Sequence, residues 1–153
     1  MSLSHDVVLN IAFAVLPMII AVGYLSGLLR TGLDLFFSLI AIVTSILIVG
    51  FDEPLPTDIA HFLYCGGLLI PVALVSQNPF LLALNAAMIL GILATRYFFR
   101  GCIINRKQKQ EGFFTSVSKI LHANVPFWDW KYIFPGLLVV SSVRFGLVLM
   151  SEE

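Results

Sequence analysis

Charged residues are scarce in this chain. They make up 12% of its 153 residues, while hydrophobic residues make up 59%. A soluble domain has about 25% charged and about 45–50% apolar residues. A single soluble core of this size cannot hide such an excess, because small domains bury too small a fraction of their surface. The composition therefore predicts that lipid covers much of the surface, and the net charge of zero gives no reason to expect a nucleic-acid partner.

Recognisable chemical motifs are also lacking. The two cysteines, Cys65 and Cys102, form no CxxC pair and no zinc spacing. We expect free thiols, which leaves the redox compartment open. The first six residues contain no Lys or Arg and no small-residue cleavage site, so we expect the first hydrophobic run to be a retained span and not a signal peptide. With no catalytic, nucleotide or metal motif, the sequence predicts neither an enzyme nor a bound cofactor or metal.

Long hydrophobic runs dominate what is present. A helix needs about 20 residues to cross about 30 Å of hydrocarbon. Five runs meet this need, at 7–29, 33–50, 59–75, 80–99 and 132–150. The third is short and contains Gly66, Gly67 and Pro71, so a re-entrant segment is an alternative; Thr57 or Asp58 is expected to cap it. The predicted fold is all-α, a polytopic helical membrane protein with five spans in one domain.

Residues 101–131 do not form a span. Five apolar residues between 112 and 124 fall on one helical face: Phe113, Phe114, Val117, Ile120 and Leu121. Several aromatic residues follow this segment, and aromatic side chains concentrate at the depth of lipid headgroups. The pattern predicts an amphipathic helix lying in the membrane interface.

The cations are unevenly distributed. Five spans place the N-terminus, the acidic loop 51–57 and the segment 101–131 on one face, here called side A; the opposite face is side B. Seven of the nine Lys and Arg residues lie at or near side A: Arg96, Arg100, Arg106, Lys107, Lys109, Lys119 and Lys131. By the positive-inside rule, side A is the cytoplasm-equivalent face and the C-terminus lies opposite.

Arg144 is the most informative polar residue, because it lies inside the fifth hydrophobic run. A charge at the bilayer centre costs about 2.5–3.5 kcal/mol on insertion scales. Asp34 lies near the side B end of the second run, at a comparable depth. One interpretation pairs the two residues as a gate or proton path. The alternatives are a structural ion pair, or an Arg144 side chain that extends toward the headgroups by itself.

His61 and Asp58 form a second candidate group, one helical turn apart in the third run. A membrane histidine can ligate haem or relay protons, but no second span contains a histidine. The alternative is an interfacial histidine bonded to a carbonyl or to Asp58. Because consecutive antiparallel helices are neighbours, we expect Asp58 to meet Arg96 or Arg100 of the fourth run.

Other polar residues in the spans are Asn10, Thr44, Ser45 and Asn85. Such residues could line a pathway, but more often they form hydrogen bonds between helices. Gly23 and Gly27 form a GxxxG pattern, which is typical of a packing face. The cations from Arg96 to Lys109 could bind anionic lipid or serve only to set topology.

His61 opens a short Gly-rich run, and Arg100-Gly101-Cys102-Ile103-Ile104-Asn105 closes the next. In this the chain resembles small uncharacterised multi-pass membrane proteins of bacteria and large DNA viruses. Those proteins have a hydroxyl residue and then Glu after the Cys. Here Asn105 takes the hydroxyl position and the nearest acid is Glu111. The resemblance covers residues 58–111 and assigns no site residue. It implies a small membrane protein of unknown activity, and a component of a virion membrane is one such protein.

Three functions remain open at this point. The first is a structural or accessory subunit of a larger assembly, such as a viral inner membrane under its capsid or an energy-transducing complex, with membrane lipids and other subunits as partners. The second is a small transporter or channel, which would use Arg144 and Asp34. The third is a haem- or quinone-binding subunit, which would use His61 and Cys65.

Overall fold

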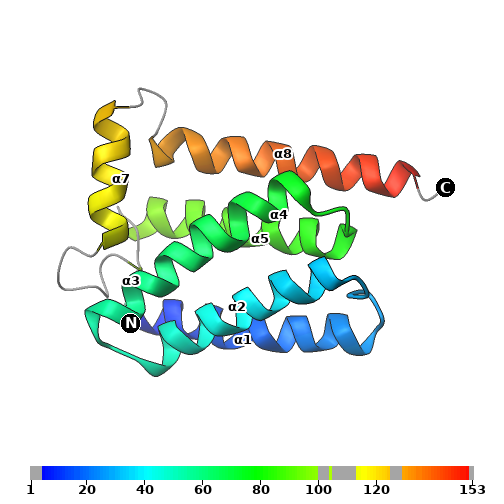
Figure 1. Cartoon of the computed structure of the whole chain (residues 1–153), viewed down its shortest axis with the longest axis horizontal. Coiled ribbons are helices and arrows are strands. Elements are labelled where there is room, and N and C mark those ends of the chain that lie inside the picture. The colour runs from blue at the N-terminus through cyan, green and yellow to red at the C-terminus, as the bar shows by residue number, and fades with distance from the viewer. Residues whose placement is uncertain (1–4, 100–103, 105–112, 125–128, 152–153) are drawn as a thin grey trace.

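The computed structural model describes residues 5–99, 104, 113–124 and 129–151 (Figure 1). The described part is helical and contains no strand. Its elements are α1 (His5–Leu25), α2 (Gly32–Gly50), α3 (Pro54–Phe62), η1 (Leu63–Leu69), α4 (Ile70–Val75), α5 (Pro79–Phe99), α7 (Phe113–Asn124) and α8 (Trp130–Ser151). Five segments are long and apolar enough to cross a membrane: Asp6–Leu25, Gly32–Gly50, Pro54–Val75, Pro79–Phe99 and Lys131–Ser151. The predicted all-α polytopic fold is confirmed.

The five long segments alternate in direction. Figure 1 shows α1 beginning and α8 ending at opposite ends of the bundle, with α7 at the end where α1 begins. This odd number of crossings agrees with a chain whose termini lie on opposite faces. The assignment of side A as the cytoplasm-equivalent face stays a prediction.

The third segment differs from its prediction in two ways. It is continuous over Pro54–Val75 and long enough to cross, so it is not re-entrant. It also begins earlier than expected: Glu53 is the N-cap, Pro54 begins the helix, and Thr57 donates its hydroxyl to the Glu53 carbonyl at 2.9 Å. Prolines are tolerated in a first helical turn because the N–H groups there have no intrahelical partner. Neither Thr57 nor Asp58 therefore caps this helix; both lie inside it.

The middle of this segment is a π-helix, η1. The Ile70 amide donates to the Cys65 carbonyl, five residues earlier. In an ordinary α-helix the ring of Pro71 would clash with the carbonyl of Gly67. The wider π turn changes the hydrogen-bond register just before that proline, which explains its position.

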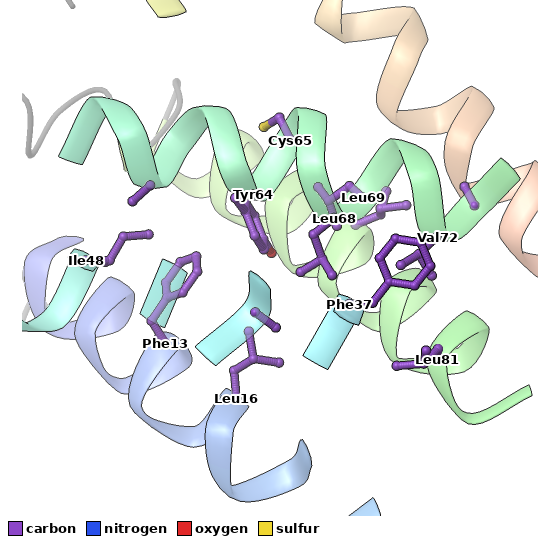
Figure 2. Packing of buried hydrophobic residues seen from close by; sticks show 14 of the residues in the cluster. Phe13, Leu16, Phe37, Ile48, Tyr64, Cys65, Leu68, Leu69, Val72 and Leu81 are labelled. Atoms are coloured by element: carbon purple, nitrogen blue, oxygen red, sulfur yellow. The ribbon is translucent and has the colours of Figure 1, made fainter. Parts of the chain in front are cut away.

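The core is built from apolar faces with helical spacing. On α1 the buried residues are Leu9, Phe13, Leu16 and Ile20. α2 packs against α1 on one side and against α3 and η1 on the other, while α5 packs along α8. Figure 2 shows Tyr64 of η1 directed toward Phe13, and the two rings meet edge to face with centroids 5.0 Å apart.

Gly23 and Gly27 do not form one packing face. Gly23 packs closely on α5: a Cβ atom there would lie 2.6 Å from the Phe80 ring. Gly27 lies beyond the end of α1 with φ of 68°. Its amide bonds to the Tyr24 carbonyl and the Leu28 amide to the Gly23 carbonyl, the two bonds of a Schellman motif. Gly27 is therefore required to end the helix and does not pack between helices.

The segment predicted to lie in the interface is the helix α7. It runs across the ends of the spans in Figure 1 and contacts α3. Of its predicted apolar face, Val117 and Leu121 are half-buried and Ile120 is exposed. The side chains of Phe113 and Phe114 lie outside the described part of the chain.

Candidate functional site

Arg144 binds the C-terminal end of α4. Its Nη1 donates to the Ala73 carbonyl at 3.1 Å and its Nη2 to the Ser76 carbonyl at 2.8 Å. These carbonyls lie in the last turn, where helix carbonyls lack intrahelical partners and the helix dipole is negative. The planar guanidinium presents its donors from two separate nitrogens in a fixed geometry, whereas Lys offers a single ammonium group on a flexible stem. Arg144 is thus a cap contributed by a different helix.

The predicted pairing of Arg144 with Asp34 is therefore wrong. α8 packs against α4 and α5, whereas α2 packs against α1, α3 and η1. The Asp34 carboxylate instead accepts the backbone amides of Arg30 and Thr31, at 3.1 and 3.0 Å, and the Asp34 amide donates to the Thr31 hydroxyl. This is a capping box at the start of α2. Asp34 is a helix-capping residue, which explains how its carboxylate is stabilised while buried.

A recess of about 850 Å³, lined by both polar and apolar residues, opens beside Asp34, between the two connections at side B. Its polar lining includes Arg30, Gln77 and Asn78. The Asn78 side chain donates from Nδ2 to the Leu28 carbonyl at 2.7 Å, which joins the two connections. Its Oδ1 accepts the backbone amides of Phe80 and Leu81, so Asn78 also caps α5. The Asn-Pro pair before the fourth span is the sequence signal for this cap.

The second predicted pairing, of Asp58 with Arg96, is also not formed. Arg96 instead stacks on Phe134 of α8, with its Cζ atom 5.7 Å from the ring centroid. The reason is that α5 meets α4 at their connection but then follows α8, while α3 packs on α2 and α7. Asp58 and His61 are both buried in α3. Arg100, the other predicted partner, lies outside the described residues.

Asn85 connects three helices at the centre of the bundle. It is fully buried, and its Nδ2 donates to the Leu69 carbonyl of η1 at 3.1 Å and to the Ser141 hydroxyl of α8 at 3.0 Å. This agrees with the interhelical interpretation of Asn85. Ser141 was missed by the sequence analysis, because serine is common in hydrophobic runs and does not reveal its partner.

An apolar cleft of about 260 Å³ separates α1 from α5. Its walls come from residues 8–19 of α1 and 84–96 of α5, with Tyr64 and Ile104 also in the lining. Toward side B the two helices come together where Gly23 meets Phe80. Toward side A the lining includes Arg96. The cleft thus runs from a closed apolar end to an end that carries a cation.

The described residues contain no group of three or more His, Cys, Asp or Glu side chains that could hold a metal ion. Cys65 is buried, and Cys102 is not among the described residues. No protein-family model matches the chain, and neither a curated protein nor a solved structure matches it. The resemblance based on residues 58–111 stays a prediction. The case for a function therefore depends on the contacts above.

Proposed function

We propose that this chain is a structural or accessory multi-pass membrane subunit of a larger assembly, without catalytic activity of its own. The observation that carries the proposal is the use of the charge inside the fifth span. Arg144 holds the end of α4 and does not face Asp34. The two charges that first suggested a transport path, Arg144 and Asp34, thus each stabilise a helix end.

The exposure of α8 supports the same proposal. Only 11% of its most apolar stretch is buried within the chain, compared with 50% for Pro54–Val75. Val143 is one of its exposed residues. An accessory subunit needs such a surface for a neighbouring subunit, and α8 is the span that the rest of the chain covers least. A virion membrane or an energy-transducing complex would provide such a neighbour.

The test is whether the tagged chain, expressed at its native level and extracted in a mild detergent, purifies with other subunits at fixed stoichiometry. We expect Val143→Trp on α8 to release those subunits. Val22→Trp, at a similarly exposed site on α1, should retain them. A chain that purifies alone and conducts ions in proteoliposomes would overturn the proposal and favour the transporter.

A further inference from the structure

The cleft between α1 and α5 fits a lipid chain. We propose that it binds one acyl chain of an anionic phospholipid from the side A leaflet, with the phosphate against Arg96. This inference does not depend on the proposed function, since an accessory subunit and a transporter could each hold such a lipid.

The length of the cleft matches one leaflet. Residues 8–19 of α1 line it, and 11 steps of about 1.5 Å give about 17 Å. Half of the hydrocarbon thickness of about 30 Å is about 15 Å. The cleft closes where Gly23 meets Phe80, nearer to side B. An acyl chain entering from side A would therefore end where the two helices come together.

The walls favour hydrocarbon over water as an occupant. Their side chains are almost entirely apolar, including Phe13, Leu16 and Met88. An enclosed apolar cavity of about 150 Å³ binds small hydrocarbons, and this cleft of about 260 Å³ has the same kind of lining. Filling it with a hydrocarbon chain restores the dispersion contacts that an empty cleft would lack.

The position of Arg96 selects the headgroup. It is the only charged side chain among the described residues that line the cleft. Phe134 holds one face of its guanidinium, and no carboxylate in the described part of the chain pairs with it. Its N–H donors are therefore available for a phosphate, which a guanidinium binds through two parallel hydrogen bonds. A neutral lipophile would leave this cation without a partner.

The experiment measures lipid retention by native mass spectrometry. The protein is purified in mild detergent micelles that contain equal amounts of phosphatidylglycerol and phosphatidylcholine with the same acyl chains. We expect one retained phospholipid. Both lipids carry a phosphate, but the choline cation of phosphatidylcholine opposes Arg96, so phosphatidylglycerol should be favoured about fivefold, the ratio that corresponds to about 1 kcal/mol for one cation near the surface.

Two pairs of variants separate the acyl chain from the headgroup. Gly91 lines the cleft, and a Cβ there meets nothing within 4 Å. Gly91→Phe should abolish retention of both lipids. Gly146→Phe should not, because Gly146 lies on α8, where a Cβ also meets nothing within 4 Å. Arg96→Gln should keep a lipid but lose the fivefold preference. Lys131→Gln, which removes an exposed cation outside the cleft, should keep the preference.

Ala12→Phe fills the cleft from α1 and serves as the second cleft-filling variant if Gly91→Phe does not fold. Each variant is first shown to be monodisperse, with the helicity of the parent chain. Retention of lipid by both folded cleft-filling variants would overturn the proposal. An equal loss of preference in Arg96→Gln and Lys131→Gln would overturn the headgroup assignment, and retention of lipid only by a dimer would show that a second copy forms the site.

Discussion

Replacing Arg144 by Met tests whether this residue holds α4. Met keeps an unbranched apolar stem but removes both donors from the carbonyls of Ala73 and Ser76. A hydrogen bond from a charged group contributes about 1.5–3 kcal/mol, so two give a gross loss of about 3–6 kcal/mol. Relief from placing a cation in the bilayer returns at most about 2.5–3.5 kcal/mol. Because the guanidinium lies at the end of α4 and not at the bilayer centre, the relief is at the lower figure, and we expect a net destabilisation of about 0.5–3.5 kcal/mol.

The assay is reversible unfolding in mixed micelles, followed by helicity. Arg144→Lys discriminates between the two structural explanations. A residue that only extends toward headgroups would be replaced fully by Lys, since both side chains reach the interface. A bidentate carbonyl cap would be replaced only in part. Val143→Met, at the exposed neighbour, should change stability by less than about 0.5 kcal/mol. Equal stability of Arg144→Met and the parent chain would refute the capping argument.

Three further predictions concern topology and stability. Cysteines placed singly at Gln108 and Ser151 should react with an impermeant thiol reagent from opposite faces; labelling from one face would refute five crossings. Gly27→Ala should destabilise by about 1 kcal/mol because its φ is positive, while Gly146→Ala, in open space within α8, should not. Asn85→Leu should lower the free energy of unfolding by about 0.6–1.7 kcal/mol, the usual range for interhelical polar contacts. In the double variant with Ser141→Ala, the loss should be smaller than the sum of the two single losses; an exact sum would mean that the contact contributes nothing.

The spans were predictable because their physical cause is local. A hydrophobic run of the right length has one stable solution in a bilayer, a helix whose backbone bonds are internal. The same reasoning failed at Pro54, where prolines in an acidic stretch looked like a loop but occupy a first helical turn. It also failed at Gly27, because a GxxxG pattern does not reveal that the helix ends before its second glycine.

The partners of the polar residues were not predictable, for a different reason. Arg144 and Asn85 donate to carbonyls of the backbone, at Ala73, Ser76 and Leu69. Every residue has such a carbonyl, so the sequence does not show which carbonyl is the acceptor. An acidic side chain was the expected partner of Arg144, and Asp34 was the candidate at a similar depth. Asp34, however, caps its own helix.

These contacts divide the bundle into two parts with different kinds of cohesion. Arg144 of α8 and Asn85 of α5 bind the backbone of η1 and α4, on either side of the proline that interrupts regular helical bonding. On the other side, α1 and α2 join η1 through apolar contacts such as Phe13 with Tyr64. The cleft lies between α1 and α5, at the junction of the two parts. Hydrogen bonds hold α5 and α8 to η1 and α4 whether or not lipid is bound. The dispersion contacts between α1 and α5, by contrast, depend on what fills the cleft. A bound acyl chain would therefore stabilise the junction more than either part. The helix whose packing should depend most on bound lipid is α1.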